Sequence, residues 1–171
     1  MARNPLPLEL LLSLLESGPP RIAECTAGLN PTQLRTPPAP DEWSANEVLA
    51  HLRACADMWG GYIGRMLAEA HPRIRVINPR TWIKRTNYLK QEFDHNLQAF
   101  TDQRAELLET LRVLSPEEWE RTATMTGAGK PLERNVRSYA ESLAIHERPH
   151  LKQITHIAER IVRTTTHTLE D

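Results

Sequence analysis

The chain has 171 residues, a formal net charge of −1, 40% hydrophobic residues and 25% charged residues, which is an ordinary composition for one globular domain. The small net charge excludes a general positive field that would hold nucleic acid or an anionic membrane. No stretch approaches the roughly 18 apolar residues of a membrane-spanning helix. Two cysteines, Cys25 and Cys55, are too few for a disulfide scaffold and fit a reducing compartment. We therefore expect a cytoplasmic protein without a nucleic-acid or membrane partner.

The N-terminal segment is predicted to be a helix with an interruption. Apolar residues recur at helical spacing from about Leu6 to Gly28. Glu9 interrupts the apolar run and no small-residue cleavage pattern follows, so we do not interpret it as a signal peptide. Gly18-Pro19-Pro20 stands inside the segment, and proline removes a backbone donor and clashes with the preceding turn. We expect a kinked or broken helix there, with a second piece that ends near Ala27.

The second helix has the clearest start in the chain. In the segment WSANEV, the side chains of Ser44 and Glu47 can each bond the other residue's backbone amide, which makes a capping box. Trp43 and Val48 occupy the two positions of a hydrophobic staple. The helix is predicted to continue to about Ala68, with apolar residues at steps of three and four.

A long connection and a third helix follow. Two prolines and few periodic positions mark the connection from His71 to about Tyr88. Trp82 lies within it and could line a substrate entrance or seal the end of the bundle. The third helix is predicted from about Lys90 to Leu114, where apolar residues recur at helical spacing.

The last third of the chain is predicted to hold a short helix, a loop and a long helix. Ser115 begins the short helix with a capping box and a proline at the first helical position. Thr122 to Glu133 carries two glycines and is predicted to be a loop. The long helix is predicted from about Val136 to Val162, and the segment 163–171 to be a flexible tail. Strand signals are scarce, so the sequence predicts one all-α domain at residues 1–162, a four-helix bundle.

His146 and His150 are the strongest candidates for chemistry. Residues four apart lie one above the other on a helix, and this spacing lets one helix offer two imidazoles to one metal ion. Both lie on the apolar stripe of the last helix, where an unpaired ring nitrogen has a desolvation cost. A lone inward histidine is more often a hydrogen-bonded core residue, but two stacked ones weaken that interpretation. Gln153 follows one turn later as a hydrogen-bond partner or a surface amide.

His51 on the second helix is the third candidate ligand. It lies on the inward edge of its helix, and a metal site in a bundle needs ligands from facing helices. Cys55, one turn later on the same face, could also approach a metal, although a buried core position is the more common fate of a free cysteine. The other histidines fit less well by position, and they are His71, His95, His156 and His167.

The segment HERPH matches the H-E-x-x-H pattern of zinc proteases, and we interpret the match as accidental. Pro149 deprives that turn of a backbone hydrogen bond, and Glu147 projects to the side of the stripe that carries the histidines. Inward carboxylates are hard to find, because Asp57 and Glu141 fall off the apolar stripes. A carboxylate di-iron site is therefore disfavoured as well.

These segments together resemble the DinB/YfiT-like superfamily of metal-binding four-helix bundles. The matching pieces are PDEWS at 40–44, EVLAHL at 47–52, QRAELL at 103–108 and HERPHLKQI at 146–154. The resemblance implies a nickel or zinc site made by His51, His146 and His150, often in a dimer. Relatives include transferases that use bacillithiol or mycothiol and a mycothiol-dependent maleylpyruvate isomerase. Pro149 between the two histidines departs from the pattern in detail.

Three neutral imidazoles leave a coordination position open, which is the arrangement of a catalytic rather than a structural metal site. We therefore predict a metal-dependent transferase that joins a low-molecular-weight thiol to a small electrophile, with both the thiol and a homodimeric state suggested by the resemblance alone. Three alternatives stay open. They are a metal-dependent hydrolase, a non-enzymatic metal-binding or stress-related protein, and a structural bundle with hydrogen-bonded core histidines.

Overall fold

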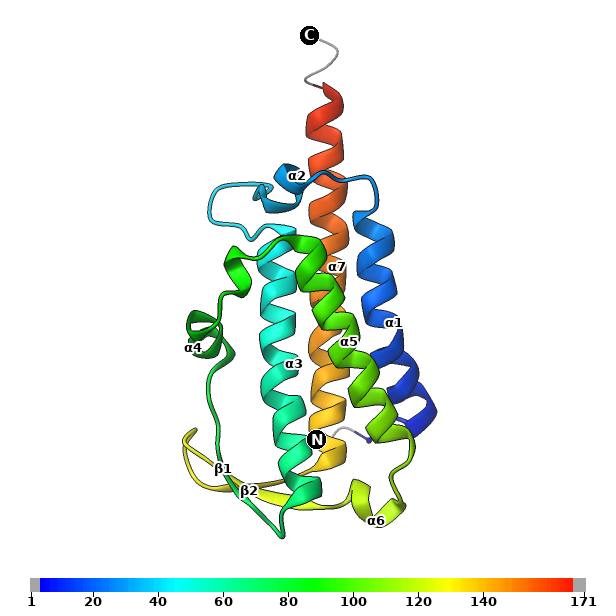
Figure 1. The fold of residues 1–171 in the computed structure, drawn as a ribbon, viewed down its shortest axis with the longest axis vertical. Helices are drawn as coiled ribbons and strands as arrows, with labels where there is room; N and C mark the ends of the chain where they lie inside the picture. The colour runs from blue at the N-terminus through cyan, green and yellow to red at the C-terminus, as the bar shows by residue number, and fades with distance from the viewer. Residues whose placement is uncertain (1–3, 168–171) are drawn as a thin grey trace.

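Four long helices lie alongside one another in the computed structural model, which describes residues 4–167 (Figure 1). They are α1 (Leu8–Thr26), α3 (Ala45–Ala68), α5 (Phe93–Arg112) and α7 (Val136–His167). Both α1 and α3 pack against α5 and against α7, so α1 lies diagonally opposite α3. The predicted four-helix bundle is confirmed. No helix among the described residues is long and apolar enough to cross a membrane.

Helix α3 begins and ends where the sequence predicted. The Ser44 hydroxyl accepts from the Glu47 amide at 3.3 Å, and the Ser44 amide donates to the Glu47 carboxylate at 2.8 Å. This capping box satisfies two amides that a helix start otherwise leaves without a partner. Most of the helix is buried, including Val48, His51 and Cys55, so its face towards α7 and α5 carries both core and candidate-site residues.

Helix α1 is continuous, so of the two predicted alternatives, a kink or a break, the break is wrong. Gly18, Pro19 and Pro20 all lie inside it, and Gly18 and Pro19 are buried. An internal proline costs a helix about 3 kcal/mol. Leu15 and Ile22, on either side of the prolines, are fully buried, and burying one such side chain contributes about 1.5–3 kcal/mol. Burial of side chains such as these against α5 and α7 is therefore of the size needed to offset the two internal prolines.

Three short helices follow a common pattern, in which a capping side chain precedes a proline at the first helical position. Asn30, Asn78 and Ser115 accept from backbone amides of the turns that they precede. The helix after Ser115 is the short extra helix that the sequence predicted, and the other two were not predicted. The short elements are α2 (Pro31–Arg35), α4 (Pro79–Trp82), α6 (Pro116–Trp119) and the 3-10 turns η1 (Ile83–Arg85) and η2 (Tyr88–Lys90).

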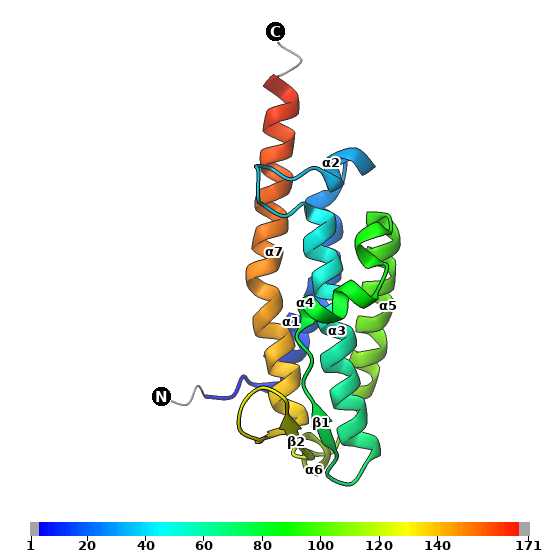
Figure 2. The ribbon, with the colours of Figure 1, turned by 90° about the vertical axis from the view of Figure 1, so that its left-hand side faces the viewer.

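A small sheet covers one end of the bundle, beside α6 (Figures 1 and 2). It consists of β1 (Arg73–Arg75), β2 (Thr122–Thr126) and β3 (Leu132–Asn135), with β2 parallel to β1 and antiparallel to β3. The prediction of a loop at Thr122 to Glu133 is therefore wrong. In β1 only Ile74 faces the core, so three residues give no apolar alternation long enough to detect.

The last helix is longer than predicted. Helix α7 continues through His167, five residues beyond the predicted end at Val162 and into the segment predicted to be a flexible tail. The rest of that tail, residues 168–171, lies outside the described residues. Pro149 lies within α7 without ending it, and the helix therefore presents His146 and His150 on consecutive turns.

Candidate metal centre

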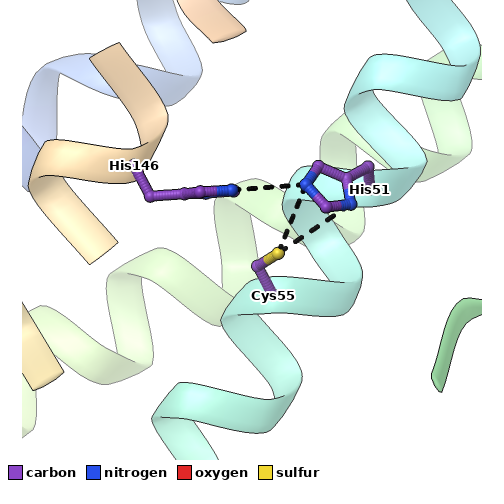
Figure 3. Close-up of side chains that lie close together, drawn as sticks. All are labelled: His51, Cys55 and His146. Carbon is purple, nitrogen blue, oxygen red and sulfur yellow. Dashed lines mark hydrogen bonds between the residues drawn. The ribbon is translucent and has the colours of Figure 1, made fainter. Parts of the chain in front are cut away.

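His51 on α3 and His146 on α7 face each other across the interface between these two helices (Figure 3). Their Nε2 atoms are 3.3 Å apart, and their ring centroids are 5.2 Å apart. The residue His51 is 8% exposed and His146 is partly buried. The two rings therefore meet inside the bundle, away from bulk water.

His150 lies against both of these rings. Its ring centroid is 4.9 Å from that of His51 and 4.7 Å from that of His146. Its Nδ1 is 3.0 Å from the side-chain oxygen of Gln153. When this Nδ1 carries the proton and donates it to Gln153, Nε2 keeps a lone pair. The structure thus brings together all three histidines that the sequence singled out, and it gives Gln153 the hydrogen-bonding role that was one of its two predicted alternatives.

Cys55 lies closer to this cluster than the sequence indicated. Its sulfur is 3.6 Å from Nε2 and 4.0 Å from Nδ1 of His51. Donor atoms of His51, Cys55 and His146 all lie within 4.8 Å of one another, and His150 is not part of that tightest group. Cys55 is also a buried residue, 1% exposed, as the core interpretation expected.

Two tryptophans border the histidine rings. The Trp43 ring packs edge-on against His51 at 5.3 Å and parallel to His150 at 6.5 Å. The Trp59 ring packs edge-on against His146 at 5.1 Å. The sequence assigned Trp43 to a staple, and the contacts of both tryptophans with the histidines were missed. They shield the cluster from water, which strengthens electrostatic interactions within it.

Burial keeps the imidazoles neutral. It lowers the pKa of His51 to about 4, with further lowering from the neighbouring His150, His146 and Arg80. Burial, followed by His150, lowers the pKa of His146 to about 4. Both rings are therefore unprotonated at pH 7 and have a lone pair for a metal ion. Burial also raises the pKa of the Cys55 thiol to about 12, so this sulfur keeps its proton without a metal.

The residues present fit a divalent transition metal. Two nitrogens that bind a tetrahedral ion at about 2.0–2.1 Å lie about 3.3 Å apart, which matches the separation of the two facing Nε2 atoms. Nδ1 of His146 is buried without a hydrogen-bond partner among the described residues, so the surrounding protein does not satisfy this ring as an ordinary core histidine. Neutral imidazole is a good ligand for both zinc and nickel.

A pocket of about 380 Å³ opens beside His150. Trp43 and Gln153 line it next to His150, and so do the acidic residues Asp41 and Glu42. Arg80 of α4 and His156 of α7 line it too, and both are exposed. A small molecule in this pocket would lie next to the ring of His150, and the guanidinium of Arg80 would be available to an anionic group.

The sequence model of the DinB superfamily matches residues 14–154, which is most of the chain. The chain belongs to the DinB superfamily. A search of curated proteins gives no match.

Solved structures of low sequence identity share the fold. YfiT from Bacillus subtilis, described as a probable metal-dependent hydrolase with an unusual four-helix bundle topology, superposes with a TM-score of 0.79 at 17% identity, over 94% of this chain and 93% of that one. A mycothiol-dependent maleylpyruvate isomerase superposes with a TM-score of 0.67 at 15% identity, over 93% of this chain and 68% of that one. A mutant of that isomerase superposes with a TM-score of 0.68 at 14% identity, with the same coverage.

In this DinB-superfamily chain, the glutamate of HERPH, Glu147, pairs with a residue of another helix rather than with the histidines. The carboxylate of Glu147 forms an ion pair with Arg104 of α5, and both residues are almost fully buried. Burial raises the pKa of Glu147, and the guanidinium opposes this shift. The pair was missed, although Arg104 stands four residues from Phe100 and from Leu108, on the buried stripe of α5. Gly18 of α1 leaves room for this carboxylate because glycine has no side chain. A Cβ atom at this position would lie only 3.2 Å from Oε2 of Glu147.

Asp57 fixes the connection that contains Trp82. Its carboxylate accepts from the Trp82 indole at 3.4 Å, from the Tyr88 hydroxyl at 2.7 Å and from the Gln103 amide. Burial and the adjacent carboxylate raise the pKa of Tyr88 to about 12, so its hydroxyl stays a donor. Trp82 therefore fastens the connection to α3, which explains a residue that the sequence left open.

The other acidic residue and histidines that the sequence placed outside the candidate site lie as follows. Glu141 accepts from the Leu6 amide at 3.0 Å and lies outside the histidine cluster. His71 contacts the hydroxyls of Thr122 and Thr124 at the sheet. His95 is exposed on α5, whereas the side chain of His167 lies outside the described part of the chain.

Proposed function

We propose that this protein is a metal-dependent enzyme in which His51, His146 and His150 hold one divalent transition metal, zinc or nickel. The observation that carries the proposal is the convergence of three imidazoles from two helices beside a surface pocket. Three histidines leave a coordination position for a substrate, as in catalytic zinc sites. A bound ion would supply Lewis acidity, which lowers the pKa of a coordinated thiol or water.

The chain's own residues supply binding, orientation and exclusion of water. His51 and His146 would hold the ion together with His150, and Gln153 fixes the His150 ring through Nδ1. Trp43 covers the rings on the pocket side. Arg80 offers a positive charge to a substrate in the pocket, where it forms no ion pair with any described residue.

The reaction that we propose is transfer of a low-molecular-weight thiol to a small electrophile, with a new carbon–sulfur bond and departure of a leaving group. The shared fold with a mycothiol-dependent isomerase supports a thiol as the co-substrate. We further propose that the protein works in the cytoplasm, in keeping with its two cysteines, and that it is a homodimer, as the family resemblance suggests.

The test is a conjugation assay with the purified protein. Metal-free protein, and protein reloaded with zinc or nickel, are mixed with a panel of bacterial thiols and a halogenated electrophile. We expect turnover that depends on the metal and is lost in His146→Ala, while His95→Ala on the exposed face of α5 keeps it. Absence of metal-dependent turnover across a broad panel would contradict the transferase.

A metal-dependent hydrolase is the second candidate. YfiT, which is described as a probable metal-dependent hydrolase, matches nearly the whole of this chain with a TM-score of 0.79. The two reactions are separated by omitting the thiol: a hydrolase cleaves ester or amide substrates with the reloaded metal alone, and a transferase does not.

A non-enzymatic metal-binding or stress-related protein is the third candidate. It would gain support if His146→Ala abolished metal binding and lowered the melting temperature while no substrate in either panel competed for the metal.

A further inference from the structure

We infer that Cys55 is a fourth protein ligand of the metal, so that the centre has three imidazoles and one thiolate and a substrate would enter as a fifth ligand. This inference rests on the metal site proposed above. Cys55 stands one turn after His51 on the same face of α3, and Figure 3 shows its sulfur directed towards the His51 ring, in the space between α3 and α7. Cys55 and His51, whose ring it contacts, are both buried.

The distances match those expected between ligands of one tetrahedral ion. A zinc–sulfur bond of about 2.3 Å and a zinc–nitrogen bond of about 2.05 Å, at a tetrahedral angle, place sulfur and nitrogen about 3.5 Å apart. The sulfur of Cys55 is 3.6 Å from Nε2 of His51, and that nitrogen is 3.3 Å from Nε2 of His146. The third pair of donor atoms, the sulfur of Cys55 and a ring nitrogen of His146, lies within 4.8 Å, so a movement of at most about 1.3 Å would bring these three donors to tetrahedral spacing.

The charge of the site favours a thiolate. Three neutral imidazoles would leave a full double positive charge among buried residues, and an uncompensated buried charge is costly. Glu147, the nearby buried carboxylate, is already neutralised by Arg104. A thiolate from Cys55 would reduce the net charge of the centre to +1 on ion binding, with the thiol proton released to solvent.

A hydrogen bond alone explains the placement of Cys55 less well. A thiol is a weak donor, and one S–H can point at only one of the two ring nitrogens of His51 that lie within 4.0 Å of the sulfur. Sulfur ligation also has a consequence for metal choice, because a soft thiolate favours zinc over harder ions.

The inference is tested with cobalt(II) as a spectroscopic replacement for the native metal. The three proteins are the wild type, Cys25→Ala and Cys55→Ala, each freed of metal, loaded with cobalt(II) and measured by absorption spectroscopy. Cysteine thiolate bound to cobalt(II) gives an intense charge-transfer band in the near ultraviolet, whereas imidazole ligands alone give only the weaker visible bands.

We expect the charge-transfer band in the wild type and in Cys25→Ala, which has Cys55 as its sole cysteine. Cys55→Ala should keep the visible bands, lose the charge-transfer band and bind zinc at least about 10-fold more weakly. Because Cys25→Ala decides the source of the band by itself, the test does not depend on Cys55→Ala remaining folded.

Two results would overturn the inference in distinguishable ways. Visible cobalt bands without a charge-transfer band in Cys25→Ala would exclude Cys55 as a ligand and leave the three-histidine site standing. Absence of any cobalt or zinc binding by the wild type would overturn the inference together with the proposed function.

Discussion

The ring of His150 is held by Gln153, whose side-chain oxygen lies 3.0 Å from Nδ1 of the histidine on the adjacent turn of α7. The contact selects the tautomer in which Nε2 has a lone pair, and it restricts rotation of the ring. His150 is the candidate ligand beside the pocket, so without this contact it would have the greatest freedom to turn away.

Gln153→Leu should therefore weaken metal binding without removing it. Loss of such a supporting hydrogen bond typically reduces metal affinity about 10- to 100-fold. The measurement is competition between the protein and a chromophoric chelator for zinc. Gln98→Leu, at an exposed position of α5 where the side chain bonds Asp102, is the control and should bind zinc like the wild type. Equal zinc affinity of Gln153→Leu and wild type would show that Gln153 does not support the site.

The metal-free protein should lose stability in mild acid. The pKa values of His51 and His146 in the folded protein are about 4, below the ordinary value of 6.5. As the pH falls below about 6.5, the unfolded chain takes up protons that the folded one rejects, so folding stability falls. Each histidine contributes a slope of at most about 1.4 kcal/mol per pH unit, less where water reaches the ring.

The measurement for this prediction is urea unfolding of chelator-treated protein between about pH 7 and pH 5, above the range where most carboxylates titrate. The midpoint should fall steadily across this range in the wild type and less steeply in His146→Leu, which lacks one of the two titrating rings. A midpoint that is constant over the range would mean that the rings are not buried in neutral form.

The buried pair of Arg104 and Glu147 should be essential for stability. Removing one partner of a buried pair leaves an uncompensated charge and costs about 3–5 kcal/mol. Arg104→Met should therefore lower the free energy of unfolding by this amount, and the double variant with Glu147→Leu should recover part of the loss. Urea unfolding at pH 7 measures both changes.

An exposed ion pair provides the control for this prediction. Arg112 and Glu16 are 2.7 Å apart between α5 and α1, and both side chains are largely exposed. Arg112→Met should cost less than about 1 kcal/mol. If Arg104→Met had an equally small effect, the buried pair would be irrelevant to the stability of the bundle.

Asp57 should control the mobility of the connection between α3 and α5. Asp57→Ala removes the acceptor for the Trp82 indole and the Tyr88 hydroxyl, so the segment between them should open more often. Trypsin should then cleave the folded protein several-fold faster after Lys84 or Arg85, which lie within this segment. Asp102→Ala, on the exposed face of α5, should leave the cleavage rate unchanged. A cleavage rate equal to that of the wild type would contradict the role of Asp57.

The long helices were predictable because their signals are local and strong. The capping box at Ser44 defines the start of α3, and uninterrupted steps of three and four define α7. The prolines of α1 were misleading because tertiary burial of Leu15 and Ile22 overrides a local penalty. The sheet escaped detection because β1, with only Ile74 facing the core, depends on pairing with β2 from a distant part of the chain.

The candidate site was predictable in part for the same reason. His146 and His150 stand at helical spacing, and an inward position on the second helix suffices to propose His51. The approach of Cys55 to His51, and of Trp59 to His146, depends on side-chain rotamers and on the rotation of α3 relative to α7. Neither is fixed by residue spacing within a single helix.

Metal content is the most direct measurement of the central claim, that His51, His146 and His150 hold one metal ion. The full chain is purified without chelator, and zinc, nickel and other divalent metals are determined by elemental analysis. We predict about one transition-metal ion per chain in the wild type and in His95→Ala, and less than about a tenth in His146→Ala. Less than about a tenth of an ion per chain in the wild type, also after incubation with zinc or nickel, would contradict the site.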